Sequence, residues 1–289
     1  MNVQENFLGL NENISEYSKS KAVIVQVPYE GTVTYKKGTS EGPKSIIEAS
    51  KEVEWYDDEL DYIPCDMGIS TLKPVNVKGS PEEVINNVYN ETKKSLDDNK
   101  FMITLGGEHS ITSGVVKAFK EKYPNLSVLQ LDAHSDLRES YEGTKYNHAC
   151  VMKRIFDMGI KFAQVGIRSI SEDEAPFIKQ NNLKIFFARD IYNNNKWTKE
   201  VIDSLTDNVY ITIDLDVFDP GMIPGVGTPE PGGLEWYKVI DLLKDVFKNK
   251  NVVGCDVMEL CPIKDAIVSE FTAARLVYKL ISYKFSKKL

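Results

Sequence analysis

Short apolar runs rich in β-branched residues alternate with amphipathic stretches along the whole chain, and this alternation constrains the fold more than any other feature. Alternating strands and helices are typical of an α/β domain with a mainly parallel sheet. Several runs are almost continuously apolar, as expected when helices cover both faces of such a sheet. The expected strands are Ala22–Val27, Phe101–Leu105, Ser127–Leu131, Phe162–Ile167, Lys184–Ala188, Val209–Leu215 and Val252–Met258.

The segments between these runs carry helix signals. The run from Ser80 to Glu83 combines an N-cap serine, a proline at the first helical position and a glutamate three residues after the cap. Apolar residues at helical spacing predict two further helices, over Leu234–Phe247, with Tyr237 on the apolar face, and over Phe271–Ile281. No linker, repeat or low-complexity tract interrupts the pattern, so we expect a single domain over residues 1–289.

Charge and hydropathy exclude several classes of partner. The chain has 43 acidic against 35 basic residues and a net charge of −8, which argues against a nucleic-acid partner because phosphate binding needs a basic surface. No apolar run approaches the roughly 20 residues of a membrane span. The N-terminus lacks the basic start and apolar core of a secretory signal. We therefore expect a cytoplasmic protein without a membrane partner.

Three expected strands end in acidic or histidine-containing clusters. Ligands of open parallel sheets gather at the carboxyl ends of the strands. Side chains two apart in a strand point to the same face, about 6.6 Å apart, so the members of each cluster can aim at one point. The clusters are Gly106-Gly107-Glu108-His109-Ser110, Asp132-Ala133-His134-Ser135-Asp136 and Asp214-Leu215-Asp216.

Crowded carboxylates of this kind predict bound cations, because two divalent ions neutralise four aspartates. A set of four aspartates and two histidines favours Mn²⁺ or Mg²⁺ over structural zinc, and the imidazoles favour Mn²⁺. A lone Asp-x-Asp is more often a solvated turn or a helix cap. The chain has only three histidines, however, and His109 and His134 fall in these clusters while His148 follows soon after.

These motifs resemble those of the ureohydrolases, the family of arginase, agmatinase and their relatives. Gly227-Thr228-Pro229-Glu230-Pro231-Gly232-Gly233, Asp256-Val257-Met258-Glu259 and Gly38-Thr39-Ser40-Glu41-Gly42-Pro43 also match. The resemblance covers nearly the whole chain and is closest to agmatinase. It implies a three-layer α/β/α fold around an eight-stranded, mainly parallel sheet, and a homo-oligomer, commonly a trimer or hexamer.

The resemblance also implies two Mn²⁺ ions per subunit and their ligands. One ion would be held by His109, Asp132, Asp136 and Asp214. The other would be held by Asp132, His134, Asp214 and Asp216, so that Asp132 and Asp214 bridge the two ions.

Hydrolysis of a guanidinium group needs a strong nucleophile at neutral pH. Two Mn²⁺ ions would depress the pKa of a water bound between them, and the bridging hydroxide would attack the guanidinium carbon. The leaving amine needs a proton, for which His148 matches the shuttle histidine of the family and Asp136 is a second candidate. Glu259 matches the guanidinium-binding glutamate, and Thr228 a threonine that contacts substrate. As alternatives, His148 begins a helix, and Glu259 and Thr228 are turn residues.

The tail of the substrate is less constrained by the motifs. Arginases bind the amino-acid tail with an asparagine that is Arg138 here and an aspartate that is Ser169 here. These replacements favour agmatine, hydrolysed to putrescine and urea in polyamine biosynthesis, with Glu139 attracting its amine. Guanidinobutyrase, guanidinopropionase, arginase and formiminoglutamase specificities stay open. Rival interpretations are a zinc-dependent deacylase and a non-catalytic metal-binding relative.

Overall fold

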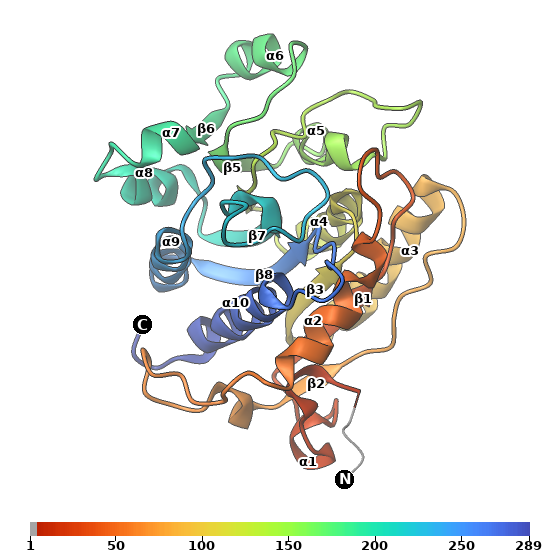
Figure 1. Cartoon of the computed structure of the whole chain (residues 1–289), viewed down its shortest axis with the longest axis vertical. Helices are drawn as coiled ribbons and strands as arrows, with labels where there is room; N and C mark the ends of the chain where they lie inside the picture. The colour runs from red at the N-terminus through yellow and green to blue at the C-terminus, as the bar shows by residue number, and fades with distance from the viewer. Residues whose placement is uncertain (1–4) are drawn as a thin grey trace.

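The computed structural model describes residues 5–289 and forms one sheet of eight parallel strands in the order β2-β1-β3-β8-β7-β4-β5-β6 (Figure 1). Residues 1–4, part of the stretch in which no secretory signal is expected, lie outside the described residues. The strands are β1 (Ala22–Val27), β2 (Ile69–Thr71), β3 (Phe101–Gly106), β4 (Leu126–Leu131), β5 (Lys161–Ile167), β6 (Lys184–Phe187), β7 (Asn208–Asp214) and β8 (Asn251–Met258).

Helices cover both faces of the sheet and give it three layers. They are α1 (Glu12–Ser15), α2 (Gly42–Ser50), α3 (Pro81–Leu96), α4 (Thr112–Lys122), α5 (Val151–Asp157), α6 (Glu174–Gln180), α7 (Ala188–Ile191), α8 (Trp197–Ser204), α9 (Trp236–Asn249) and α10 (Val268–Phe285). Apolar residues of α2, α8, α9 and α10 pack in one core cluster with alternate strand residues such as Ile24. Residues of α3, α4 and α5 pack in a second cluster with the intervening ones, such as Val23. This confirms the predicted three-layer fold.

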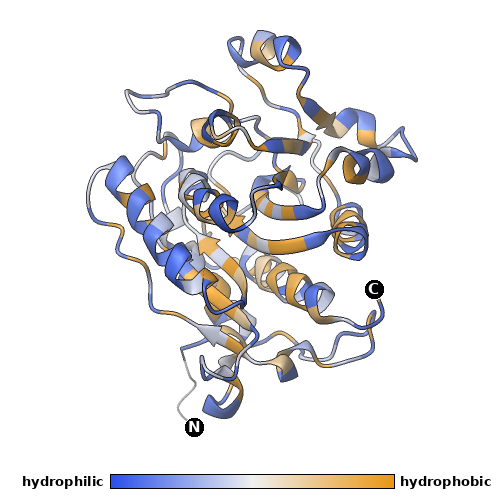
Figure 2. Cartoon of the chain, turned by 180° about the vertical axis from the view of Figure 1, so that it is seen from behind, coloured by the Kyte–Doolittle hydropathy of each residue, from blue (hydrophilic) through white to orange (hydrophobic). Residues whose placement is uncertain are grey.

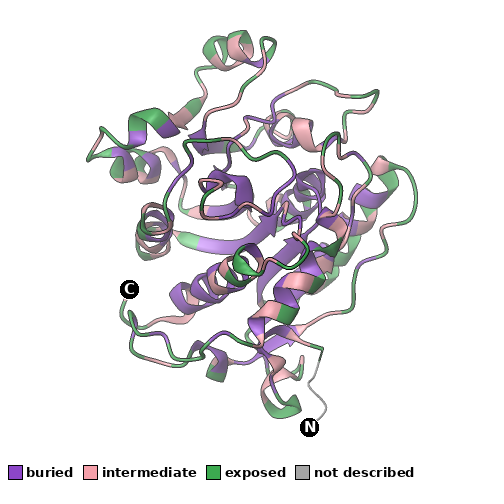
Figure 3. Ribbon diagram, in the orientation of Figure 1, coloured by how far each residue is buried: buried purple, intermediate pink, exposed green. Residues whose placement is uncertain are grey.

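The strands carry most of this apolar burial. They are mostly hydrophobic along their length (Figure 2), and the centre of the sheet is buried while the connecting loops and outer helix faces are exposed (Figure 3). A strand buried on both faces has no solvated side, which explains why the sequence shows continuous rather than alternating apolar runs.

All seven expected strands are present, each within one residue of its predicted ends. The eighth, β2, has only three residues and is too short to show a pattern. The signal from Ser80 to Glu83 is a complete capping box at the start of α3. The placement of Tyr237 on the apolar face of its helix is wrong, because α9 begins at Trp236 and Tyr237, in its first turn, is 74% exposed.

The strand order determines where functional groups can meet. β3, β8, β7 and β4 are consecutive in the sheet and parallel, so their carboxyl ends lie together at one edge. None of the helices within residues 5–289 has the length and apolar character needed to cross a membrane.

Candidate metal centre

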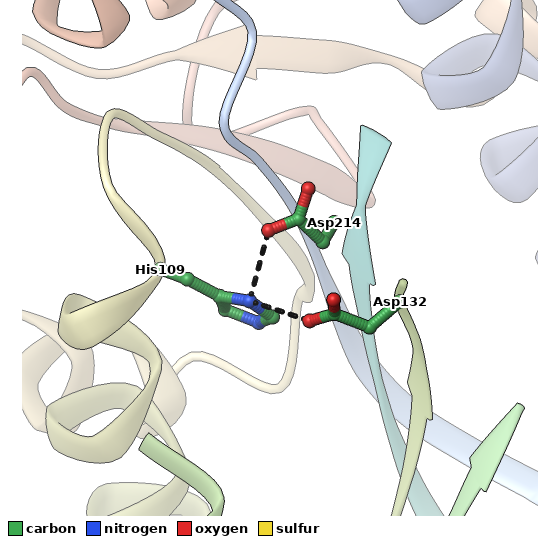
Figure 4. A group of neighbouring side chains, drawn as sticks. All are labelled: His109, Asp132 and Asp214. Carbon is green, nitrogen blue, oxygen red and sulfur yellow. Dashed lines mark ion pairs between the residues drawn. The ribbon is translucent and has the colours of Figure 1, made fainter. Parts of the chain in front are cut away.

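The three strand-end clusters of the sequence meet at this edge of the sheet. His109 begins a short 3-10 helix after β3, Asp132 directly follows β4, and Asp214 is the last residue of β7. Their side chains converge from three separate elements (Figure 4). Residues that are more than 100 positions apart in the chain are thus brought to hydrogen-bonding distance by the parallel topology.

The first group of possible metal ligands is His109, Asp132 and Asp214. The Nδ1 atom of His109 lies 3.1 Å from Oδ2 of Asp132 and 3.3 Å from Oδ2 of Asp214. Oδ2 of Asp136 lies 3.6 Å from the same nitrogen. One imidazole nitrogen and three carboxylate oxygens therefore face a common, buried point.

The second group is Asp132, His134 and Asp216. Nδ1 of His134 lies 2.8 Å from Oδ2 of Asp216 and 3.7 Å from Oδ1 of Asp132. Asp132 turns one carboxylate oxygen toward each group, which is the arrangement of a bridging ligand. Asp214, the other expected bridge, belongs to the first group and not to the second.

Backbone hydrogen bonds fix the orientation of these carboxylates. Oδ1 of Asp132 accepts from the backbone N–H of His134 at 2.6 Å, and Oδ1 of Asp214 accepts from that of Asp216 at 2.9 Å. Oδ1 of Asp216 accepts from the N–H of Ala133 at 2.9 Å, which ties the β7 motif to the β4 motif. Side chains locked in this way are preorganised for a ligand that sits between them.

The negative charge of the aspartate cluster favours a bound cation. Within residues 5–289, no lysine or arginine forms an ion pair with any of the four aspartates. Burial, reinforced by the charge of Asp132, raises the pKa of Asp136 well above its usual value, and burial with Asp216 does the same to the pKa of Asp214. Burial alone would lower the pKa of His109, but neighbouring carboxylates raise it well above its usual value. The cluster thus attracts positive charge, and protons are the substitute when no metal ion is bound.

The donor set fits metal ions. Nε2 of His109 pairs with the hydroxyl of Thr212 at 2.7 Å, whereas Nδ1 is buried and has no hydrogen-bond partner. If Nε2 carries the proton, Nδ1 presents a lone pair to three carboxylate oxygens. A divalent cation satisfies this arrangement, and metal-bound histidines usually make a hydrogen bond through the other ring nitrogen, as Nε2 does here with Thr212.

A cleft of about 230 Å³ opens onto the cluster. Its lining includes four of the six candidate metal ligands, His109, His134, Asp136 and Asp214. His148, Glu259 and Thr228, the residues expected to act on or bind the substrate, also line it. These four ligands and the three substrate-site candidates therefore share one cavity.

Comparison with known proteins identifies the fold and motifs. The sequence profile of the arginase family matches residues 20–282. The chain belongs to the arginase family. This confirms the predicted family and the predicted class of enzyme, a ureohydrolase.

Relatives in the arginase family cover almost the full chain. An N(1)-aminopropylagmatine ureohydrolase of Synechocystis sp. is 42% identical over 281 residues, covering 94% of this chain and 92% of the relative. An agmatinase of Pyrococcus horikoshii is 38% identical over 261 residues, covering 90% of each. The agmatine ureohydrolase structure of Thermoplasma volcanium superposes with a TM-score of 0.89 at 31% identity, covering 99% of this chain and 96% of that one.

In this arginase-family chain, His148 begins a 3-10 helix on the wall of the cleft. Its ring packs edge-on against Tyr141, with the ring centroids 6.5 Å apart. Burial, together with the positive charges of His134 and His109, lowers the pKa of His148 to about 4. The imidazole is neutral at pH 7, and its buried Nδ1 has no hydrogen-bond partner.

Glu259 and Asp136 share an unusual backbone conformation. Glu259 follows β8 with φ of 65°, and Asp136 has φ of 51°, both in the left-handed region that non-glycine residues rarely adopt. Such strain persists where the surroundings enforce it, often at functional sites. For Glu259 the surroundings are two hydrogen bonds, in which its N–H donates to Gly107 O at 2.9 Å and its Oε1 accepts from His109 N–H at 2.6 Å.

Of two residues in the expected tail-binding region, Arg138 lines the cleft and Glu139 does not. Glu139 does not line the cleft; it is exposed and pairs with Lys153 at 2.7 Å and Arg154 at 3.2 Å. Arg138 lines the cleft, with its guanidinium 4.7 Å from the centre of the Tyr141 ring.

Two residues without a recognisable sequence motif, Arg168 and Thr32, hold the site together. The Arg168 guanidinium donates to backbone carbonyls on both sides, 2.6 Å from Asp216 O and 2.8 Å from Glu230 O, and so joins the metal-site loop to the loop that carries Thr228. Thr32 connects two cleft segments through Glu108 and His148. The sequence pattern predicts neither the role of Arg168 nor that of Thr32, because their partners are distant along the chain.

Proposed function

We propose that this chain hydrolyses a guanidino-terminated amine and releases urea, using two Mn²⁺ ions. The observation that carries the proposal is the shared carboxylate of Asp132, which faces two histidine-containing ligand groups whose His109, His134 and Asp214 line the cleft. A deacylase with a single zinc site would not need this second group. The oxygen-rich donor set with two imidazoles favours Mn²⁺.

The proposed ligands are those expected from the family motifs. His109, Asp132, Asp136 and Asp214 would hold one ion, and Asp132, His134, Asp214 and Asp216 the other. Such ions lower the pKa of water and make hydroxide available at neutral pH. The distances around His109 and His134 support this assignment.

Two residues of the chain would act on the guanidinium group itself. The Glu259 carboxylate can bind two parallel N–H groups and so hold the guanidinium carbon over the cluster. His148 lines the same cleft and matches the shuttle histidine of the family, so we propose that it delivers a proton to the leaving amine. Asp136 is a second proton acceptor at the cleft floor, and Thr228 a contact for the substrate.

Agmatine and its N(1)-aminopropyl derivative are the two proposed substrates. Agmatine follows from the replacement of the arginase tail-binding residues by Arg138 and Ser169. The aminopropyl derivative is favoured by the 42% identity to a relative of that name. Among the carboxylates that line the cleft, Glu174 is already occupied by the N–H groups of Leu137 and Ser171. Because both oxygens of Glu174 already accept hydrogen bonds, we propose that the amine tail of the substrate does not bind Glu174 and instead extends out of the cleft into solvent.

Urea release from a panel of guanidino compounds tests the proposal. Protein loaded with Mn²⁺ is offered agmatine, N(1)-aminopropylagmatine, arginine, guanidinobutyrate, guanidinopropionate and formiminoglutamate. The expected result is the highest kcat/KM for one of the two amines, with arginine about 10²-fold lower. Absence of urea from every compound, or activity that requires one zinc ion, would overturn the proposal.

We further propose a cytoplasmic homo-oligomer, a trimer or hexamer, as the family resemblance implies. Exposed apolar side chains at the starts of two helices support a subunit interface. They are Tyr237 on α9 and Ile267, Val268 and Phe271 at α10.

A further inference from the structure

Thr32 connects two parts of the cleft that are far apart in the sequence. It lies in the segment between β1 and α2 and is only 8% exposed. Its partners are Glu108, which precedes the metal-site residue His109, and the 147–148 segment, whose His148 lines the cleft. The four residues that follow, Val33 to Lys36, line the cleft.

The contact with Glu108 fixes Thr32 at two atoms. The Thr32 N–H donates to Oε2 of Glu108 at 2.6 Å, and the Thr32 hydroxyl donates to Oε1 at 2.6 Å. Glu108 is fully buried and its own N–H donates to Tyr29 O at 2.9 Å. The segments approach so closely that a Cβ atom on Gly107 would lie 2.0 Å from Tyr29 O. Thr32 is therefore anchored to the end of β3.

The orientation of the Thr32 hydroxyl follows from this anchor. A threonine hydroxyl has one proton and two lone pairs. Because the proton is directed at Glu108, the lone pairs are free to accept, and the backbone N–H of His148 donates to Oγ1 at 3.2 Å. The side-chain amide of Asn147 donates to Thr32 O at 3.4 Å. The start of the His148 helix is thus held to the metal-site motif through a single threonine.

We propose that Thr32 is a positioning residue for His148. It fixes the backbone of His148, while Tyr141 packs against the ring, and together they set the position of the imidazole relative to Glu259 and Asp136 in the cleft. The inference rests on the proposed proton transfer by His148. Proton transfer is sensitive to geometry, and a displacement of about 1 Å costs up to about 10²-fold in rate. Removal of the Thr32 hydroxyl should therefore slow turnover without removing a metal ligand.

The test is a mutant cycle on the Mn²⁺-loaded enzyme. Thr32→Val keeps the shape and removes the hydroxyl, Thr32→Ser restores it, and His148→Asn removes the proton-transfer group. We expect Thr32→Val to lower kcat about tenfold, with KM changed less than about twofold. Thr32→Ser should stay within about twofold of the wild-type kcat. In the His148→Asn background, Thr32→Val should have no further effect.

Two controls separate positioning from general stability. Mn²⁺ per chain and the thermal midpoint are measured for every variant, and Mn²⁺ per chain should stay at the wild-type value. Thr92→Val removes another buried hydroxyl, on α3, and should leave kcat unchanged. If Thr32→Val does not fold, Thr32→Cys replaces the hydroxyl by a weaker acceptor of similar size; it should lower kcat about two- to fivefold in the wild type and not at all in the His148→Asn background.

The outcomes distinguish the two proposals. If His148→Asn keeps the wild-type kcat, proton transfer by His148 is refuted and the positioning role with it. If His148→Asn is slow but Thr32→Val is not, only the positioning role is refuted. An equal loss from Thr32→Val in both backgrounds, or loss of Mn²⁺ from Thr32→Val, also contradicts it.

Discussion

Two regions of the molecule contain carboxylates clustered around a buried aspartate, Asp57 in one and Asp132 in the other, and their charge is balanced in opposite ways. At one, Asp57 and Glu59 meet Lys279 of α10, with Nζ 3.0 Å from Asp57 Oδ2 and 2.6 Å from Glu59 Oε2. Lys244 of α9 lies 2.7 Å from the other oxygen of Glu59. At the other, the strand-end aspartates have no lysine or arginine partner within residues 5–289.

The pKa of Glu59 falls while the pKa values of Asp136 and Asp214 rise; burial alone would also raise the pKa of Asp132, but His109 and His134 lower it. Burial alone would raise the pKa of Glu59, but hydrogen bonds from Lys244 and Lys279 outweigh it and lower that pKa to about 2. Burial raises the pKa values of Asp136 and Asp214 well above the usual range, and the negative charges of nearby carboxylates raise them further. A buried acid with a fixed cation stabilises the fold, whereas acids without one define a place for a cation from outside.

The largest effect is expected at the shared carboxylate. Asp132→Asn keeps the side-chain shape but removes the charge that faces both ligand groups, so kcat should fall about 10³-fold or more as Mn²⁺ is lost. The urea assay measures the fall in kcat, and metal analysis measures the loss of Mn²⁺. Asp57→Asn, the matched change in the lysine-paired cluster, should keep both Mn²⁺ and kcat. If Asp132→Asn keeps the wild-type Mn²⁺ per chain, the claim that the strand-end aspartates bind an external cation, unlike the lysine-paired cluster, is contradicted.

Removing the internal cation should affect stability instead of catalysis. Lys279→Met leaves Asp57 buried without its partner, which costs about 3 kcal/mol of the free energy of unfolding. Denaturant unfolding of the metal-free protein gives this value. We expect Mn²⁺ per chain to stay as in the wild type. A change below about 0.5 kcal/mol would show that the pair does not stabilise the fold.

His148→Asn should separate catalysis from metal binding. We expect kcat to fall about 10²-fold, the usual contribution of a positioned acid–base group. Mn²⁺ per chain should not change, because His148 belongs to neither ligand group. Steady-state kinetics with metal analysis tests both statements, and loss of Mn²⁺ would make His148 part of the metal site instead.

The smallest effect is expected in acid. The pKa of Glu59 is depressed in the folded chain, so its contribution to stability is complete above about pH 4.3, the unfolded value, and is lost as the pH falls toward about 2. Unfolding of metal-free protein at pH 5 and pH 3 should therefore show a steeper loss for the wild type than for Glu59→Gln. Equal losses would contradict the assigned shift.

Much of the fold and the candidate ligand set could be predicted from sequence because both depend on local patterns. A mostly apolar strand followed by Asp132-Ala133-His134 marks a buried strand and its functional end without further information. β2 escaped prediction because a three-residue strand has no periodicity. Tyr237 was misplaced because Val239, Leu242, Leu243 and Val246 form the buried face of α9, and at about 100° per residue Tyr237 lies on the opposite, exposed side.

The connections within the site could not be predicted, for a different reason. Thr32 meets Glu108 and His148 at separations of 76 and 116 residues, and a lone threonine in a loop carries no signal of either contact. Glu139 has the charge to attract an amine, but its carboxylate forms ion pairs with Lys153 and Arg154 of the neighbouring helix α5. Competition between nearby cations is decided by packing, which sequence patterns do not record.

The most direct test of the account is the number of Mn²⁺ ions that metal-free protein binds at saturation, measured by equilibrium dialysis and metal analysis. The two ligand groups that share Asp132 predict two ions per chain, with urea release from an agmatine-type substrate appearing as they fill. Saturation at one ion or none, in a folded protein, would contradict the claim that the unpaired carboxylates at the sheet edge form a two-metal centre.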